Sequence, residues 1–100
     1  MQTDWAVEKF VDDCRYRGLS KKTIGRYLWA FSKLQTAHPE LPRKPEPIKQ
    51  LIASQDLATE SRFDLWRCYR RLYAWLSVGY KVPNVMAKVP PPKRARRLPR

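Results

Sequence analysis

The stretch SKKTIGRYLWAFSKLQTAHP, residues 20–39, decides the fold. Its apolar side chains recur at the spacing of one helical face, which predicts an amphipathic helix; they are Ile24, Tyr27, Leu28, Phe31 and Leu34. Ser20 is the expected N-cap, because its hydroxyl can accept a hydrogen bond from a free backbone N–H of the first turn. The helix should close at His38-Pro39, since the residue before a proline avoids the helical region.

A second helix is predicted just upstream, over residues 4–17. Its apolar face has the spacing i, i+3, i+4, i+7 and consists of Val7, Phe10, Val11 and Cys14, with Trp5 extending it at the start. Thr3 or Asp4 is the expected N-cap. Gly18 should end the helix, because glycine adopts the left-handed conformation without a Cβ clash. The short link to Ser20 then predicts a tight αα-hairpin.

Downstream, four prolines within residues 39–47 predict a stiff, extended connection. A short helix should follow over 47–54, with Pro47 in its first turn and Ile48, Leu51 and Ile52 on one face. A longer helix is predicted over 60–78, capped by Thr59 or Ser61 and ended by Gly79. Its apolar face consists of Leu65, Tyr69, Leu72 and Leu76, flanked by Trp66 and Tyr73.

The last twenty residues, 81–100, differ from the rest in composition. They contain five prolines and seven basic side chains but no acidic one. Such a segment buries too little apolar surface to offset its ordering entropy, so by itself it should be mobile. Val85, Met86 and Val89 remain able to dock locally. No strand and no internal repeat is expected, so the predicted fold class is all-α.

Composition restricts the kinds of function. One hundred residues suit a single domain. Cys14 and Cys68 are too few for a disulfide scaffold and are expected to be thiols in the core. With His38 as the only histidine, neither a metal site nor a cofactor is expected. No apolar run is long enough to span a bilayer, and the N-terminus lacks the pattern of a secretory signal, so a cytoplasmic location is expected.

The net charge of +12 is concentrated in three segments. Residues 21–37 carry +4, residues 61–80 carry +3 and residues 81–100 carry +7, whereas residues 1–20 and 38–60 each carry −1. A charge this large on so short a chain favours association with polyanions. Nucleic acid is the first candidate partner, and an anionic membrane surface is the second.

Two predicted helices carry a basic face opposite their apolar side. On the first, Lys22, Arg26, Trp29 and Lys33 follow the spacing i, i+4, i+7, i+11; on the second lie Arg67, Arg70 and Arg71, with Arg62 earlier. A charged helical face is often only a solvated one. Here, however, like charges one turn apart cost about 0.2–0.5 kcal/mol per pair and few acids balance them. Trp29 fits two interpretations: contact with a sugar or thymine methyl, or cover for a neighbouring helix or another part of the protein.

The order of motifs resembles the core-binding domain of tyrosine recombinases, the phage integrase family. Residues 17–24, RGLSKKTI, with Tyr27 and Phe31, are similar to the family's entry to its second helix. Residues 72–79, LYAWLSVG, resemble its fourth helix and terminating glycine. Asn84, Val89-Pro90 and Leu98-Pro99 are similar to the linker that leads into the catalytic domain. One departure is that Asn84 precedes Val85, where the family commonly has proline.

The resemblance implies a four- to five-helix SAM-like orthogonal bundle with a basic, proline-rich C-terminal tail. It implies a core-binding domain over residues 1–82 and a basic linker over 83–100. In the family, such a domain clamps core recombination sites on double-stranded DNA together with a C-terminal catalytic domain and other recombinase protomers. Catalysis belongs to that other domain, so no catalytic residue is expected in this chain, and a membrane is not an expected partner.

The expected DNA contacts come from both basic faces and from the tail. They are Lys21, Lys22, Arg26, Trp29 and Lys33; Arg67, Arg70 and Arg71; and Lys88, Lys93 and Arg94. Two alternatives remain: a free-standing helical DNA-binding regulator, and a SAM-like module that binds proteins. RNA binding is less favoured, because the sequence has neither a glycine-containing clamp loop nor an aromatic sheet motif.

Overall fold

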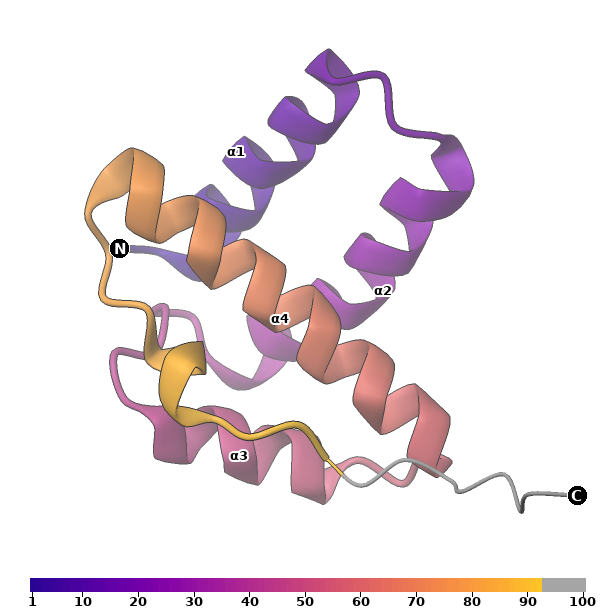
Figure 1. Ribbon diagram of the computed structural model, residues 1–100, viewed down its shortest axis with the longest axis vertical. Coiled ribbons are helices and arrows are strands. Elements are labelled where there is room, and N and C mark those ends of the chain that lie inside the picture. The colour runs from indigo at the N-terminus through magenta and orange to yellow at the C-terminus, as the bar shows by residue number, and fades with distance from the viewer. Residues whose placement is uncertain (93–100) are drawn as a thin grey trace, which may run out of the picture.

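The fold, in a computed structural model that describes residues 1–92, is built from helices alone. Four α-helices, α1 (Thr3–Tyr16), α2 (Lys21–Ala37), α3 (Pro45–Ser54) and α4 (Thr59–Tyr80), are followed by a 3-10 turn, η1 (Val85–Lys88) (Figure 1). Within residues 1–92 the only strand-like pairing is an isolated antiparallel bridge between Gln2 and Glu40. The predicted all-α class is confirmed.

The link between α1 and α2 has the predicted chemistry. Gly18 has a φ of 75°, and the N–H groups of Gly18 and Leu19 donate to the carbonyls of Arg15 and Cys14, each at 3.0 Å. This pair of bonds satisfies two carbonyls at the end of α1, as in a Schellman motif. Ser20 then caps α2, since its Oγ accepts from the Thr23 backbone N–H at 3.2 Å.

The predicted N-caps of α1 were wrong. Gln2 occupies the N-cap position and makes no side-chain cap. Thr3 lies inside the helix and is fully buried, with its hydroxyl donating to the His38 carbonyl at 2.5 Å and its N–H donating to Pro39 at 2.9 Å. The loop after α2 therefore accepts both the N–H and the hydroxyl of Thr3 at the start of α1.

Two apolar residues predicted for the core face lie at the surface. Trp5 is 39% exposed and Leu28 is 42% exposed, while Ala6 and Ala30 are fully buried. The α2 face is turned toward Ala30 because Tyr69 of α4 approaches closely there, donating from its hydroxyl to the Ala30 carbonyl at 2.7 Å. A small side chain at this position permits that approach.

The limits of α3 and α4 also differ from the prediction. Helix α3 begins two residues earlier, at Pro45, because a proline fits the first turn, where its missing N–H is not needed. Helix α4 begins after Ala58, so neither Thr59 nor Ser61 caps it. It also continues through Gly79 and ends at Tyr80, and its C-cap, Lys81, has a φ of 56°. The buried Val82 follows directly and donates from its N–H to the Leu76 carbonyl at 3.4 Å.

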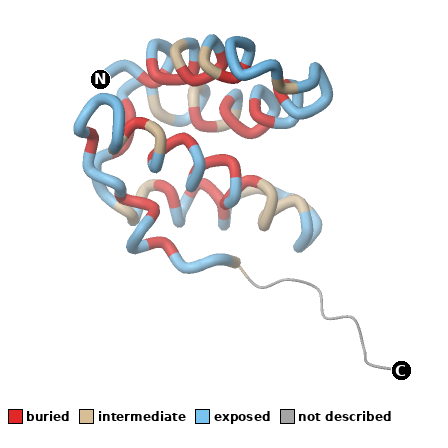
Figure 2. Tube along the Cα trace, turned by 45° about the horizontal axis from the view of Figure 1, so that its top comes forward, coloured by how far each residue is buried: buried red, intermediate tan, exposed pale blue. Residues whose placement is uncertain are grey.

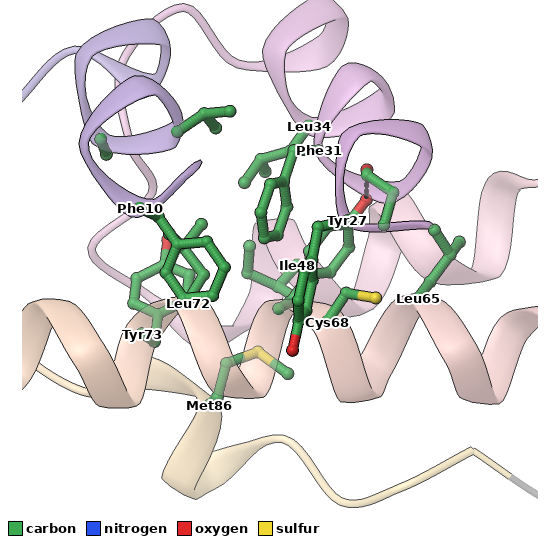
Figure 3. Close-up of a cluster of buried hydrophobic side chains, with 14 of the residues drawn as sticks. Phe10, Tyr27, Phe31, Leu34, Ile48, Leu65, Cys68, Leu72, Tyr73 and Met86 are labelled. Atoms are coloured by element: carbon green, nitrogen blue, oxygen red, sulfur yellow. Dashed lines mark hydrogen bonds between the residues drawn. The ribbon is translucent and has the colours of Figure 1, made fainter. Parts of the chain in front are cut away.

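The core lies where α4 crosses the α1–α2 hairpin (Figure 3). Phe10 meets the rings of Tyr27, Phe31 and Trp75 edge-on, with centroid distances of 5.1, 5.4 and 5.6 Å. Tyr73 of α4 is fully buried and donates from its hydroxyl to the Pro42 carbonyl at 2.6 Å. Buried residues line the inward faces of the helices (Figure 2).

The segment after α4 packs against α3 and α4. Its buried side chains are Val82, Val85, Met86 and Val89, and the segment runs alongside α3 in Figure 1. The local docking of Val85, Met86 and Val89 is confirmed. The apolar side chains of these residues lower the free energy of the folded chain by being buried, which the basic residues of the tail do not.

Both cysteines, Cys14 and Cys68, are buried free thiols, as predicted. In the part of the chain that the structure describes, no cluster of three or more His, Cys, Asp or Glu side chains is placed to hold a metal ion. None of the helices described in residues 1–92 is long and apolar enough to cross a membrane.

Candidate nucleic-acid interface

A pocket of about 190 Å³ lies between α2 and α4. Three arginines line it, Arg26 from α2 and Arg67 and Arg71 from α4, and all three are exposed at the surface. The remaining lining residues are Thr23, Tyr27, Asp64 and Cys68. The basic faces of two helices thus meet at one place, although they are separated by about forty residues of sequence.

Local helix geometry explains the position of these side chains. On α4, Asp64, Arg67, Cys68 and Arg71 follow the spacing i, i+3, i+4, i+7, which puts them along one strip of the helix. The strip borders the buried face that contains Leu65 and Leu72. On α2, Arg26 directly precedes the buried Tyr27, so its side chain leaves the helix at the edge of the core.

A hydrogen bond across the pocket fixes one of the arginines. Arg71 Nη1 donates to the Tyr27 hydroxyl at 3.2 Å. The Tyr27 ring is buried and stacks on Phe31 at a centroid distance of 5.7 Å. Because the ring cannot move freely, the phenol oxygen is a fixed acceptor that holds the Arg71 guanidinium at the pocket.

The electrostatics of the pocket are strongly positive. Three guanidinium groups face a single carboxylate, Asp64, whose Oδ1 lies 3.7 Å from Arg67 Nη1. Both partners of this ion pair are partly exposed, so solvent screens it and it contributes little to stability. The pocket therefore retains an excess of positive charge that Asp64 only partly offsets.

Cys68 forms part of the pocket wall. Burial raises the pKa of its thiol to about 11, and the Asp64 carboxylate acts in the same direction. The charges of Arg26, Arg71 and Arg67 all lower that pKa, which agrees with their position around the same pocket. The thiol nevertheless stays protonated at neutral pH, so it is not an activated nucleophile.

Other predicted contacts on α2 lie outside the pocket. Lys21 and Lys22 are exposed in the first turn. Trp29 is 37% exposed, and Lys33 Nζ lies 5.3 Å from its ring centroid. Lys33 also borders a second hollow, formed with Ser54 and Gln55 at the end of α3. Trp29 and Lys33 therefore extend the basic face of α2 toward α3 and do not join the arginine pocket.

The predicted contacts on α4 separate in the same way. Arg70 is exposed and lies over the Trp66 ring, at 5.3 Å from its centroid, so it flanks the C-terminal segment. Lys88 is exposed in η1 on that segment. Lys93 and Arg94 lie outside the described residues.

Arg62 has a structural role instead of a surface one. It is half-buried, and its Nη2 donates to the Gln55 carbonyl at 3.1 Å. Gln55 is the C-cap of α3, so Arg62 joins the start of α4 to the end of α3. The predicted basic face of α4 is thus reduced to Arg67, Arg70 and Arg71.

The sequence alone did not single out four pocket residues, Thr23, Tyr27, Asp64 and Cys68. Tyr27 and Cys68 were predicted as core residues, which they are, and their second role depends on how α2 and α4 cross. The spacing of Asp64, Arg67 and Arg71 on one strip of α4 was available as a signal. It would have placed the carboxylate beside two of the three arginines.

No family model, curated protein or solved structure matches the chain. The function is therefore inferred from the chain's own residues.

Proposed function

We propose that this chain binds double-stranded DNA through the surface formed by α2 and α4. The observation that carries the proposal is the convergence of Arg26, Arg67 and Arg71 on one pocket with a single opposing carboxylate. Like-charged guanidinium groups so placed raise each other's energy unless an anion neutralises them. A polyanion removes that cost and releases its counterions on binding.

Duplex DNA suits this surface better than a compact anion does. Exposed cations continue beyond the pocket on both helices, with Lys22 on α2 and Arg70 on α4. The major groove admits an α-helix, and arginine and lysine reach both phosphates and guanine edges. Trp29, with Lys33 over its ring, offers an exposed aromatic face to a sugar or thymine methyl.

We further propose that the chain is a SAM-like core-binding domain of a tyrosine recombinase. It is supported by the motif RGLSKKTI, in which Gly18 supplies the positive φ and Ser20 the helix cap. Such a domain would clamp core recombination sites during DNA integration and recombination, alongside a catalytic domain and other protomers. In this proposal the chain contributes binding and positioning in the cytoplasm, and strand cleavage relies on residues outside it.

A salt titration of binding to a hydroxyl-terminated duplex tests DNA binding. If about six phosphates are neutralised, the slope of log K against log salt should be about −5. Arg26→Gln and Arg71→Gln should each weaken binding, whereas Arg43→Gln, which removes the same charge from an exposed position in the α2–α3 loop, should have a smaller effect. A flat salt response, or unchanged affinity in both pocket variants, would contradict the proposal.

A protein-binding module is the second candidate, because a separate aromatic surface lies at the opposite end of α4. Tyr80 packs edge-on against Trp5 at 5.2 Å and contacts Trp75 at 5.3 Å, and Tyr80 and Trp5 are 42% and 39% exposed. If the chain associates through this surface, Tyr80→Asp should abolish a concentration-dependent dimer in sedimentation experiments. A wild-type chain that stays monomeric at high concentration argues against self-association.

A further inference from the structure

We infer that the pocket between α2 and α4 seats one internal backbone phosphate of the bound duplex, held by Arg26, Arg67 and Arg71. The inference rests on the proposed DNA binding and goes further. It names the chemical group that enters the pocket, limits it to one and identifies a residue that positions the donors.

The size of the pocket fits a single phosphate. A cavity needs roughly 10–15 Å³ of accessible space to hold one water molecule, so the pocket, at about 190 Å³, has ample room for a polyatomic anion. That is enough for one tetrahedral oxyanion and a few waters that stay with it. The backbone of a duplex can therefore insert one phosphate between the two helices, while its neighbours remain at the surface.

The donors around the pocket match a phosphate in kind and number. Each guanidinium presents planar N–H donors that bind phosphate oxygens in pairs. Thr23 adds a hydroxyl at the α2 wall, and its Oγ1 already accepts from Ser20 Oγ at 3.0 Å. With Ser20 as the donor in that bond, the Thr23 O–H can donate to another acceptor, for which a phosphate oxygen is well suited.

Tyr27 is a positioning residue for this site. Its hydroxyl accepts from Arg71 Nη1 at 3.2 Å, and its ring is wedged between Phe10 and Phe31 in the core. An arginine held in this way loses less side-chain entropy when a phosphate binds. Removing only the phenol oxygen should therefore weaken phosphate binding without changing the charge of the pocket.

The distribution of cations favours an internal phosphate over a terminal one. Lys22 on α2 and Arg70 on α4 are exposed and neither lines the pocket, so both helices also carry positive charge outside it. A backbone that continues on either side of the seated phosphate meets these cations. A terminal phosphate would leave one side of the surface without a partner.

Nuclear magnetic resonance of the arginine Nε–Hε groups tests phosphate binding in the pocket directly, with inorganic phosphate as the probe. The signals of Arg26, Arg67 and Arg71 should shift together along one saturable curve, while Arg43 should show only a small, linear drift. Tyr27→Phe should weaken this binding at least threefold, and Arg43→Gln should leave it unchanged. Pocket arginines that respond no more than Arg43 would overturn the inference.

Duplex binding distinguishes the source of the phosphate and separates the two proposals. Hydroxyl-terminated and 5′-phosphorylated duplexes of one sequence should bind equally; several-fold tighter binding of the phosphorylated duplex would assign the pocket to a terminal phosphate.

Arg71→Gln should lower the magnitude of the salt slope by about 0.9 for the lost phosphate. If steep duplex binding persists unchanged in Arg71→Gln and Tyr27→Phe while Arg26→Gln still weakens it, DNA binding through α2 and α4 stands and the phosphate site is wrong. If inorganic phosphate saturates the pocket while no duplex binds, the proposed function fails as well.

Thermal unfolding of each variant identifies damage to the fold. Arg71 is exposed, so Arg71→Gln should unfold close to the wild-type temperature. If Tyr27→Phe is measurably less stable than the wild type, the binding of the two chains is compared at a temperature at which both are folded. Arg71→Gln then tests phosphate binding independently.

Discussion

Trp66 Nε1 donates a hydrogen bond of 2.9 Å to the carbonyl oxygen of Val89, twenty-three residues further along the chain. Both residues are buried, so this bond fastens the C-terminal segment to α4 in a place that water does not reach. Arg70 lies over the same indole, 5.3 Å from its centroid. One side chain thus links the core, the C-terminal segment and the basic surface.

Trp66→Phe should lower the free energy of unfolding by about 1–3 kcal/mol, because the buried Val89 carbonyl loses its donor. The docked segment should also open more readily, so trypsin should cleave after Lys88 faster than in the wild type. Urea unfolding and the cleavage rate measure the two effects. Trp29→Phe is the matched control, since Trp29 is partly exposed and its change should stay within about 0.5 kcal/mol. Equal losses in the two variants would refute the role of the bond.

Gly18→Ala should destabilise the fold by about 1 kcal/mol. The φ of Gly18 is 75°, and an added Cβ would meet no atom within 4 Å, so the cost comes from the backbone conformation alone. Gly25→Ala is the control: Gly25 lies inside α2, its added Cβ would also meet open space, and alanine should stabilise the helix by about 0.5–1 kcal/mol. Chemical denaturation should therefore move the two variants in opposite directions, and a shared sign would contradict the conformational explanation.

Local signals in the sequence were enough to predict where α2 begins and ends. Ser20 and His38-Pro39 act on backbone groups within a few residues, so their effect does not depend on the rest of the fold. The start of α1 could not be predicted in this way. The Thr3 N–H donates to the Pro39 carbonyl in the loop after α2, a contact between residues that are far apart in the sequence.

The core face and the pocket depended on how the helices cross. Leu28 fits the helical spacing of α2 as well as Phe31 does, and only the approach of Tyr69 to Ala30 turns the face away from Leu28. Likewise, the sequence located positive charge on two helices but could not show that Arg26 meets Arg71. That meeting depends on the crossing of α2 and α4, for which the sequence carries no local signal.

Stability should fall as the pH rises above about 9. Burial raises the pKa of Cys68 from 9.0 to about 11, so the folded chain holds this proton more tightly than the unfolded chain does. The contribution is complete below pH 9 and is lost between pH 9 and 11, at roughly 1 kcal/mol for each pH unit. Tyr69 and Tyr73, whose pKa values burial also raises, should steepen the decline above pH 10.

Cys68→Ala isolates the thiol in this pH dependence. The variant should lose stability through its smaller side chain by an amount that does not change with pH. The difference between wild type and variant should then shrink from pH 9 to pH 11 in urea unfolding experiments. A difference that stays constant over this range would show that the Cys68 thiol does not titrate as described.

Asp64→Asn should strengthen DNA binding, roughly threefold at low salt, because it removes the carboxylate beside the three pocket arginines. Damage to the fold cannot mimic a gain in affinity, so the direction of the change is informative. Asp12→Asn is the matched control. Asp12 pairs with Arg15 on α1 at the same i, i+3 spacing, and the distance between their charged atoms is 3.6 Å, compared with 3.7 Å for Asp64 and Arg67. Fluorescence anisotropy with one labelled duplex compares the two variants. If net charge alone governs binding, both should gain equally; if the pocket binds the backbone, only Asp64→Asn should gain substantially, and its advantage should fade as salt screens the site.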